Sequence, residues 1–396
     1  MKRYNLTAFI ICVLVLVAFS FIYHVWDGIS DINLIKVGFL SENDEMTANT
    51  YNFEQSQNIL MKEFDDRIEI ISLTNVQREE TSSALTELVL KGCSVIFANT
   101  RSTDVKKTAA LYPEVQFCQI SNDVPAAVDT DGNYHTFNAK IYQGHYVAGV
   151  AAGMKLQELI ESGEIGEDEA LIGYVGTYPI AEVISGYTAF ILGVRSVVPD
   201  AVMRVRYTEA LSSFSREKAA ASQLINEGCV IIAQNSGTTG PVSAIQDASL
   251  TRTVIHVGYN ESMIDAASTV SLVSSRKNWD PYMVSAVRAV MNRQPIEKVV
   301  AGEVHGNDIC AGFEQGWVEM LELNEDLAAP GTSERIESLI EDIKNGKIDI
   351  FRGDYTGVNP DNQRITIDLK EGFAENSESS KPTFRYILRG VVTVEK

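Results

Sequence analysis

A glycine-rich segment follows an apolar run near the middle of the chain, and its residue types are suited to holding a small ligand. The stretch INEGCVIIAQNSGTTG, residues 225–240, ends in amide, hydroxyl and glycine residues. A phosphate-binding loop of the G-x-x-x-x-G-K-[ST] type needs a Lys and a spacing that residues 235–240 lack. A catalytic oxyanion, a small neutral ligand and no ligand at all stay open as alternatives for this loop.

The motifs of common catalytic machinery are absent from the sequence. No G-x-S-x-G nucleophile elbow, no H-E-x-x-H zinc motif and no G-x-G-x-x-G after a strand occurs. The five His residues are scattered, and a single strand residue such as His256 is more often a core residue than a ligand. We therefore expect no catalytic residues and no cofactor, and we favour a binding protein over an enzyme.

Metal-binding patterns are equally weak. None of the five Cys residues forms a C-x-x-C pair, and those in apolar strand-like runs are typical of small buried side chains. Residues 129–140 match the first ligand positions of a calcium loop, but Gly132 is misplaced and Lys140 replaces the bidentate Glu. A polar turn explains this segment better, so we predict no metal site.

Composition and charge exclude other classes of protein. The chain has 396 residues with a formal net charge of −20, and 45% of its residues are hydrophobic. This length suits two lobes better than a single core. A strongly acidic surface repels phosphate backbones and anionic lipids, so we expect no nucleic-acid partner.

The N-terminal segment differs from the rest in composition. Residues 1–5 carry Lys2 and Arg3, and residues 6–26 form an uncharged run apart from His24. That run is long enough to span a bilayer as a helix, and the basic pair before it favours a cytoplasmic N-terminus with the bulk outside. A cleaved signal peptide, with small residues at Ala18 and Ser20, is the alternative. Residues 27–34 then form a linker.

The remaining chain alternates short apolar runs with amphipathic stretches. Apolar runs of four to seven residues separated by single helices are typical of β-α units with parallel sheets buried on both faces. They predict strands at residues 35–40, 68–73, 93–98, 115–120, 171–175, 202–207, 229–234 and 253–258.

The two sets of strands resemble each other. LTELVLKGCSVIFANT (85–100) and ASQLINEGCVIIAQNS (221–236) share a helix closed by Gly92 or Gly228, a strand, and then Asn99 or Asn235. Coincidence is the alternative, because all β-α units share this rhythm. We predict two similar Rossmann-like lobes, formed by residues 35–138 plus about 276–300 and by residues 139–275 plus about 301–396. Hinges are expected near residues 121–140, 255–265 and 296–306.

Several longer stretches resemble one known family in the same order along the chain. NYHTFNAKIYQGHYVAGVAAG (133–153) and IGYVGTYPIAEVISGYTAFILGVRSVVPD (172–200) are similar to the basic membrane protein family, also called PnrA-like. Residues 110–117, 257–263, 274–283, 343–355 and 384–391 extend the resemblance over about residues 35–396. It implies a substrate-binding protein of an ABC importer, with a periplasmic-binding-protein type I fold and a ligand cleft between the lobes.

The resemblance also implies a purine ligand, either a base or a nucleoside. The Pro179-x-x-Glu182 run and Asn278-Trp279 look like the base-binding subgroup. Asn260 stands where nucleoside-binding members carry an Asp, and Thr50-Tyr51-Asn52 replaces their Ser-Phe-Asn. Both departures argue against ribose binding and are compatible with a base, so base and nucleoside stay open as alternatives.

The residues themselves agree with a flat polar ligand. Ligands of α/β lobes bind outside the carboxyl ends of parallel strands, where Asn and Ser supply donors and acceptors and aromatic rings supply stacking surfaces. Several of these residues also have a purely structural alternative. Tyr51 and Trp279 could pack in the core, Phe214 could form a hydrophobic staple, Glu182 could stabilise the helix dipole and Asn260 could form a turn. The predicted ligand-binding residues are Tyr51, Asn99, Glu182, Phe214, Asn235, Ser236, Asn260, Asn278 and Trp279.

We therefore expect a membrane-tethered receptor that closes on its ligand and docks on a permease, with the ATPase on other chains. A ligand-binding ectodomain of a membrane sensor without transport is the second hypothesis. A nucleoside hydrolase is the third, but it needs clustered Asp residues for metal and water where this chain has Asn and Ser.

Overall fold

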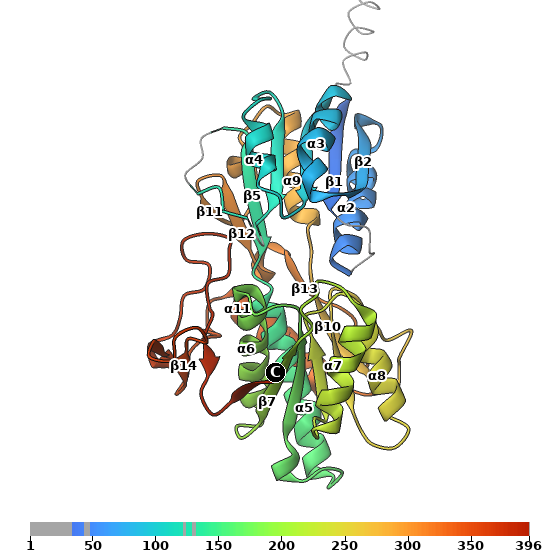
Figure 1. The fold of residues 1–396 in the computed structure, drawn as a ribbon, viewed down its shortest axis with the longest axis vertical. Coiled ribbons are helices and arrows are strands. Elements are labelled where there is room, and N and C mark those ends of the chain that lie inside the picture. Colours follow the sequence, from blue (N-terminus) through green and yellow to red (C-terminus); the bar gives the residue numbers. More distant parts are fainter. Residues whose placement is uncertain (1–33, 43–47, 122–123, 129–131, 396) are drawn as a thin grey trace, which may run out of the picture.

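The computed structural model describes residues 34–42, 48–121, 124–128 and 132–395. It contains two α/β lobes, stacked along the long axis of the molecule and joined by a narrow waist (Figure 1). The segment expected to be a membrane anchor or signal peptide, residues 6–26, lies outside the described residues. In the described part, no helix combines the length and hydrophobicity that a membrane crossing requires.

Lobe 1 is built on a seven-stranded sheet with the order β11-β12-β5-β4-β3-β1-β2. Its pairs are parallel except for the antiparallel β11–β12 hairpin. Its strands are β1 (Ile35–Glu42), β2 (Ile68–Val76), β3 (Cys93–Asn99), β4 (Gln116–Ile120), β5 (Tyr134–Ala139), β11 (Glu303–His305) and β12 (Asp308–Ala311), and its helices are α2 (Ala48–Phe64), α3 (Thr81–Leu90), α4 (Asp104–Ala109), α9 (Asp280–Met291) and α10 (Ile296–Val299).

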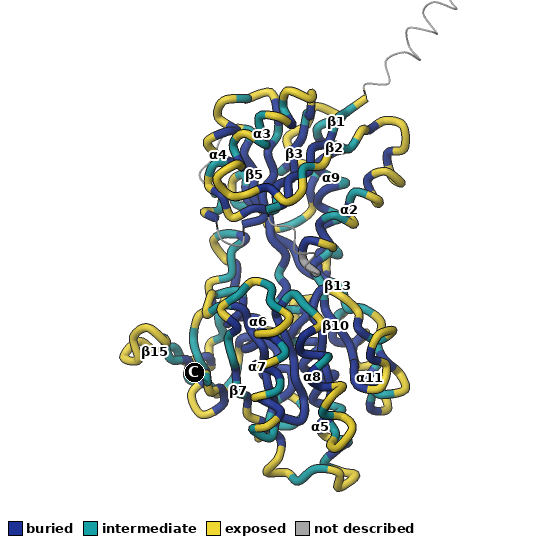
Figure 2. The backbone as a smooth tube through the Cα atoms, turned by 45° about the vertical axis from the view of Figure 1, so that its right-hand side comes forward, coloured by how far each residue is buried: buried dark blue, intermediate teal, exposed yellow. Residues whose placement is uncertain are grey.

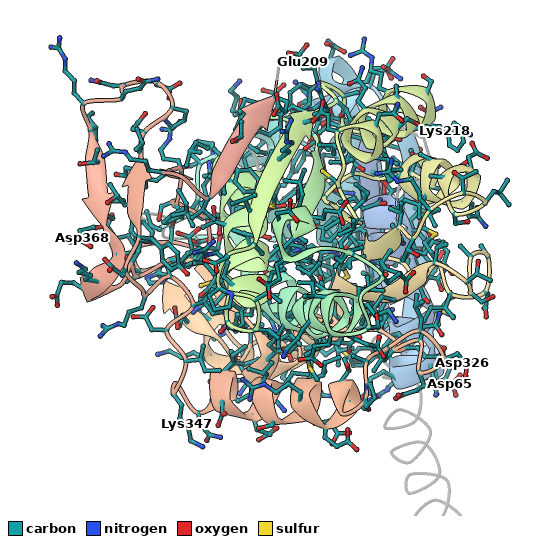
Figure 3. The ribbon with its side chains drawn as sticks, turned by 90° about the horizontal axis from the view of Figure 1, so that it is seen from below. Asp65, Glu209, Lys218, Asp326, Lys347 and Asp368 are labelled. Atoms are coloured by element: carbon teal, nitrogen blue, oxygen red, sulfur yellow. The ribbon has the colours of Figure 1, made fainter. Side chains whose placement is uncertain are left out.

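Lobe 2 has a seven-stranded sheet with the order β13-β10-β9-β8-β6-β7-β17. Only the β10–β13 pair is antiparallel. Its strands are β6 (Leu171–Gly176), β7 (Val202–Tyr207), β8 (Ile231–Gln234), β9 (Ile255–Tyr259), β10 (Ser271–Lys277), β13 (Val318–Met320) and β17 (Val392–Glu395), and its helices are α5 (Tyr142–Glu161), α6 (Ala181–Arg195), α7 (Phe214–Asn226), α8 (Gly240–Ala248) and α11 (Thr332–Lys344). A small third sheet joins β14 (Thr356–Val358), β15 (Thr366–Asp368) and β16 (Ile387–Leu388) at the side of this lobe (Figure 1), where Figure 3 labels Asp368.

The two lobes repeat one strand order, as the sequence predicted. The first five strands of lobe 1 lie as β2-β1-β3-β4-β5, and those of lobe 2 as β7-β6-β8-β9-β10. Gly92 and Gly228 close the preceding helices with φ of 89° and 99°, values that favour glycine. The α/β class, the parallel sheets and the similarity of the halves are therefore confirmed.

Each apolar run expected to be a strand forms one, but β5 and β10 were not predicted. Both carry polar residues along their length, so they lack the continuous apolar run of a buried strand. In β5 those residues are paired after burial: Thr136 Oγ1 donates to Asp308 Oδ1 at 2.6 Å, and His135 Nδ1 lies 2.5 Å from Glu297 Oε1. Hydrogen bonds to residues distant in the sequence therefore compensate for burying the polar side chains of β5.

Within the described residues, the chain passes between the two seven-stranded sheets three times. The crossings lie between β5 and α5, between β10 and α9, and between β12 and β13, at residues 140–141, 278–279 and 312–317. The predicted boundary near residue 301 is wrong, because β11 and β12 extend the lobe 1 sheet beside β5. The expected hinges at residues 255–265 and 296–306 are wrong for the same reason: β10 and β12 were not recognised.

Aromatic rings in or close to the three crossings pack together at the waist. Phe137 stacks on Tyr282 with ring centroids 3.9 Å apart, and Trp279 meets Phe137 edge to face at 5.4 Å. Trp317 contacts Tyr282 at 5.4 Å. These rings belong to a buried cluster that continues into both lobes, and Figure 2 shows the buried backbone running through the waist. The lobes therefore share a core where the chain crosses.

Small residues bring the two long helices α5 and α6 of lobe 2 into close contact. A Cβ added to Gly149 would collide with the carbonyl group of Phe190, and one added to Gly193 would collide with the carbonyl oxygen of Tyr146. Gly149 and Gly193 are thus a packing requirement of the α5–α6 contact.

Candidate functional site

The glycine-rich loop after β8, residues 235–240, is held by two buried side chains. Gln234 Nε2 donates to the carbonyl oxygens of Ser236 and Thr238 at 3.0 and 3.1 Å. Glu217 Oε2 accepts from the Thr238 amide at 3.0 Å and from its hydroxyl at 2.7 Å. Glu217 Oε1 accepts from the Ser213 amide at 3.0 Å, and the side chain is fully buried. The loop is therefore fixed before any ligand arrives.

Within this fixed loop, two predicted site residues keep unused polar atoms. Asn235 Nδ2 and Ser236 Oγ are buried and have no hydrogen-bond partner among the described residues. A buried polar atom without a partner costs roughly 1–3 kcal/mol. Such atoms are unusual in folded proteins, and a ligand is one physical reason for them.

Asn260 lies beside this loop, after the neighbouring strand β9, with a φ of 63°. Its Oδ1 accepts from the Lys277 amide at 3.1 Å, which orients the side-chain amide and leaves Nδ2 without a partner among the described residues. Its carbonyl oxygen accepts from Asn52 Nδ2 of α2 at 3.1 Å, a contact between the lobes. Asn235 and Asn260 thus line the carboxyl ends of adjacent strands, where the lobes meet.

A buried ion pair lies at the carboxyl end of β10. Lys277 Nζ is 2.9 Å from both carboxylate oxygens of Glu182, and the two side chains are only 1% and 12% exposed. Asn138 of β5 joins them, with its Oδ1 at 3.3 Å from Lys277 Nζ and its Nδ2 at 3.4 Å from Glu182 Oε2. Glu182 was predicted as a ligand acceptor, and neither of its partners, Lys277 and Asn138, was predicted as a site residue. Lys277 ends β10, which was not predicted as a strand, so no local sequence pattern marked this Lys as part of the site.

Two neighbouring predicted residues have structural roles instead. Asn278 Nδ2 donates to Gly316 O and Glu319 Oε1, while its Oδ1 accepts from the Asp280 amide at the start of α9. Trp279 is 1% exposed, with its ring against Phe137, so neither face is open for stacking. Trp279 is the N-cap residue of α9, and its ring points into the buried core at the waist. The Asn278 side chain is thus engaged within the protein, whereas Trp279 Nε1 is buried without a partner among the described residues.

Of the aromatic residues predicted to bind the ligand, Tyr51 and Phe214 stay accessible, at 40% and 48% exposed. Each lies in the first turn of a helix, α2 in lobe 1 and α7 in lobe 2, and those helix starts face the opposite lobe (Figure 1). Asn99 ends β3 and is half-buried. These three residues lie at or just after the carboxyl ends of strands. Phe214 adjoins the Asn235 loop, because a Cβ added to Gly240 would lie 2.6 Å from the Phe214 carbonyl oxygen.

Uncharged aromatic groups lie behind the ion pair. His145 of α5 stacks on Tyr259 with ring centroids 5.3 Å apart. Burial, assisted by the charge of Lys277, lowers the pKa of His145 to about 3, so its ring is neutral near pH 7. Burial also raises the pKa of Tyr174 well above its usual value. His145 Nε2 and the Tyr174 hydroxyl have no partner among the described residues. The region is thus polar but carries little net charge.

The arrangement suits binding better than chemistry. Amide and hydroxyl groups, a neutral imidazole and one satisfied ion pair can orient a small polar molecule.

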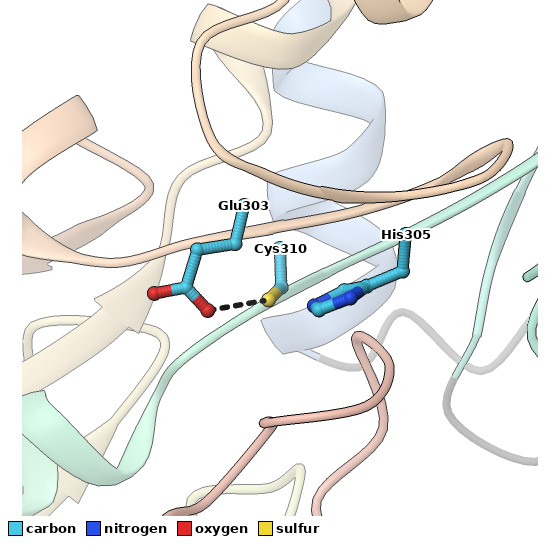
Figure 4. A group of neighbouring side chains, drawn as sticks. All are labelled: Glu303, His305 and Cys310. Carbon is cyan, nitrogen blue, oxygen red and sulfur yellow. Dashed lines mark hydrogen bonds between the residues drawn. The ribbon is translucent and has the colours of Figure 1, made fainter.

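One group of potential metal ligands occurs in the described residues. It consists of Glu303, His305 and Cys310 in the β11–β12 hairpin, and it was not predicted from the sequence (Figure 4).

Comparison with known proteins agrees with this geometry. Residues 41–352 match the family described as ABC transporter substrate-binding protein PnrA-like. A purine-binding protein of Brucella abortus (strain 2308) is 26% identical over 313 residues, covering 77% of this chain and 79% of that protein. A putative ABC transporter glucose-binding protein of Haloferax volcanii is 27% identical over 258 residues, covering 64% of this chain and 58% of its own length.

Solved structures share the fold at low sequence identity. A solute-binding protein of an ABC transporter system from Aeropyrum pernix K1 has a TM-score of 0.64 at 15% identity and covers 79% of this chain and 92% of its own. A transcriptional activator of the comK gene from Bacillus halodurans has a TM-score of 0.60 at 18% identity, with 79% and 99% covered. The fold is thus that of periplasmic-binding-protein type I neighbours. Because the family match spans most of the residues, the chain belongs to the PnrA-like family of ABC transporter substrate-binding proteins.

Proposed function

We propose that this substrate-binding protein takes a purine, and a free base in preference to a nucleoside, at the junction between its lobes. The observation that carries the proposal is the row of unpartnered polar atoms on adjacent strand ends: Asn235 Nδ2, Ser236 Oγ and Asn260 Nδ2. A purine ring offers several nitrogen acceptors at its edge, so one flat molecule can satisfy more than one of these donors.

The donors favour a ligand rich in acceptors. Glu182, the acceptor expected for a ring N–H or amino group, already has both oxygens on Lys277. Two amide donors and a hydroxyl remain, which suits a ring nitrogen next to a carbonyl oxygen. Hypoxanthine and guanine present this pattern, and we expect them to bind more tightly than adenine.

Accessible rings on the two lobes support a planar ligand. Tyr51 and Phe214 expose much of their surface at the starts of α2 and α7. Closure of two lobes over a ligand is a common hinge motion, and the crossings here are short enough to act as hinges. Aromatic stacking contributes roughly 0.5–1.5 kcal/mol beyond buried area. The rings would add affinity without selecting one purine.

The Brucella relative is described as purine-binding, while the Haloferax relative is described as glucose-binding. The binding test is therefore calorimetric titration of the purified full chain with hypoxanthine, guanine, adenine, adenosine and glucose. We expect the bases to bind, adenosine to bind more weakly, and Asn235→Ala with Ser236→Ala to weaken the base by about 10-fold or more. Binding of glucose with no response to any purine would refute the purine proposal.

We further propose that residues 6–26 tether the protein to the outer face of the cell membrane. The run is uncharged apart from His24, and a basic pair precedes it. ABC solute-binding proteins deliver small ligands to permease and ATPase subunits, so a tether would keep the receptor near its permease. N-terminal sequencing of protein from the membrane fraction tests this: a chain that starts after residue 20 would show cleavage instead.

A further inference from the structure

The β11–β12 hairpin at the edge of the lobe 1 sheet gathers three side chains of metal-binding type on one face. The antiparallel register sets Glu303 opposite Cys310. His305 follows Glu303 by two residues in the same strand, and alternate strand residues point to the same face. Figure 4 shows the carboxylate, the thiol and the imidazole lying next to one another.

The distances between these groups approach those of a coordination site. Cys310 Sγ lies 3.8 Å from Glu303 Oε2, and the three potential ligand atoms lie within 4.8 Å of one another. Ligand atoms of a tetrahedral zinc ion are separated by about 3.3–3.8 Å, given Zn–S and Zn–N bonds of about 2.3 and 2.0 Å. Side-chain movements of about 1 Å would therefore bring all three onto one ion.

A second observation points to a ligand at the same place. The Nε2 atom of His305 is buried and has no hydrogen-bond partner among the described residues. A buried imidazole nitrogen is normally satisfied by a donor, an acceptor or a metal ion. Here the polar groups that share its face of the hairpin are Glu303 and Cys310.

We propose that Glu303, His305 and Cys310 form a binding site for a borderline-soft divalent cation, with Zn²⁺ as the ion that fits best. Thiolate and imidazole ligands select zinc and its neighbours, whereas Ca²⁺ and Mg²⁺ need several oxygen ligands that this group does not supply. Glu303 is exposed, so a water molecule can complete the coordination. The Cys310 thiol transfers its proton to solvent when the metal–sulfur bond forms.

The hairpin is rigid enough to hold such a site. Asn307 in its turn donates from its backbone amide to Ala127 O at 3.0 Å, and its carbonyl accepts from the Thr136 amide at 3.0 Å. Asp308 is fully buried and accepts from Thr136 Oγ1 and the Ser380 amide, both at 2.6 Å. Because the backbone is tied on both sides, only the side chains need to move when an ion binds.

A positively charged side chain next to the site, Lys140, competes with a metal ion for Glu303. Lys140 Nζ lies 2.5 Å from Glu303 Oε1 and competes with a cation for this carboxylate, although the other oxygen faces the thiol. Burial raises the pKa of Cys310 to about 12, with Lys140 acting against this rise and Glu303 and Asp308 adding to it. The metal must therefore displace both a proton and an ammonium group. This competition predicts that removing the Lys140 charge strengthens metal binding.

The test uses the full chain, stripped with chelator and titrated with Co²⁺ as a spectroscopic substitute for Zn²⁺. A thiolate bound to Co²⁺ gives a near-ultraviolet charge-transfer band, and Zn²⁺ should abolish it by displacement. Cys310→Ser should remove the band and weaken Zn²⁺ binding by about 100-fold, and His305→Gln should weaken it by about 10-fold or more. Lys140→Met should bind Zn²⁺ more tightly than the parent.

Matched controls separate this site from other thiols. Cys93 lies in the same sheet and is also buried, so Cys93→Ser should leave the band and the affinity unchanged. Circular dichroism checks folding, and His305→Gln and Lys140→Met keep the test decisive if Cys310→Ser does not fold. A band that persists in Cys310→Ser, affinities equal to the parent in both Cys310→Ser and His305→Gln, or no Zn²⁺ binding at millimolar concentration would overturn the proposal.

Discussion

Replacing Glu217 by Gln tests whether the loop after β8 is held in place by a buried carboxylate. Glu217 is fully buried in α7 and accepts three hydrogen bonds, from the Ser213 amide, the Thr238 amide and the Thr238 hydroxyl. Gln has almost the same shape, but one of its two acceptor oxygens becomes an NH₂ group. At least one donor of Ser213 or Thr238 would then face another donor.

The expected magnitude follows from these three bonds. A hydrogen bond to a charged group contributes about 1.5–3 kcal/mol, and a neutral one about 0.5–1.5 kcal/mol. Losing one charged bond and weakening the other two predicts a destabilisation of about 2–4 kcal/mol for Glu217→Gln. Thr238→Val removes only the hydroxyl contacts and should cost about 1 kcal/mol. Because both changes affect one bond, the double variant should cost less than the sum.

Urea unfolding followed by circular dichroism measures these free energies. Glu334 provides the control, because it lies in the first turn of α11 but is exposed, so Glu334→Gln should change stability by less than about 0.5 kcal/mol. The Glu217→Gln variant should also bind its ligand more weakly, since the loop carries Asn235 and Ser236. A destabilisation below about 0.5 kcal/mol would refute the proposed anchoring of the loop, as would additivity of the two changes.

Three further outcomes follow from the structure. Asn235→Ala should weaken ligand binding by about 10-fold without lowering stability by more than about 0.5 kcal/mol, because the Nδ2 atom that it removes has no partner among the described residues, as calorimetry and urea unfolding can check. Gly149→Ala should cost about 2 kcal/mol or more in urea unfolding, because the added methyl group meets the Phe190 carbonyl. Burial lowers the pKa of His145 and His256 to about 3, so both are neutral in the folded protein. The unfolded chain binds more protons between about pH 6.5 and pH 3, so stability should fall across that window as the pH decreases, by up to about 1.4 kcal/mol per pH unit for each His.

These outcomes have their own controls. Gln157→Ala changes an exposed position on the same helix as Gly149 and should stay within about 0.5 kcal/mol of the parent. His145→Phe should reduce the slope of stability against pH between pH 6.5 and 3. An unchanged slope in that variant would contradict the assignment of a neutral buried imidazole, and a Gly149→Ala protein as stable as the parent would contradict the close α5–α6 packing.

Much of the fold could be predicted because it depends on local patterns. The continuous apolar runs of β1, β3, β6 and β8 mark strands buried on both faces, and a glycine at positive φ closes the helix before β3 and before β8. The similarity of the two halves followed from the same spacing. The loop residues Asn235, Ser236 and Asn260 could be placed at strand ends for the same reason.

The polar strands and the crossings could not be predicted in this way. β10 runs from Ser271 to Lys277 with two charged residues at its end, and β12 is four residues long with a buried Asp308. Their burial depends on partners far away in the chain, including Thr136 and Ser380 for Asp308. A pattern based on local hydrophobicity cannot contain those partners, so the predicted third boundary was placed too early.

Sequence alone determined the class of the protein: two α/β lobes with amide-rich strand ends, and a family whose members bind solutes for ABC transporters. Only the tertiary structure decided which side chains stay available to a ligand. It paired Glu182 with Lys277, turned Trp279 into the aromatic cluster at the waist and left the Nδ2 atoms of Asn235 and Asn260 without partners among the described residues. Residue type states what a group can bond to, but availability depends on which distant groups the fold brings within about 3 Å of it.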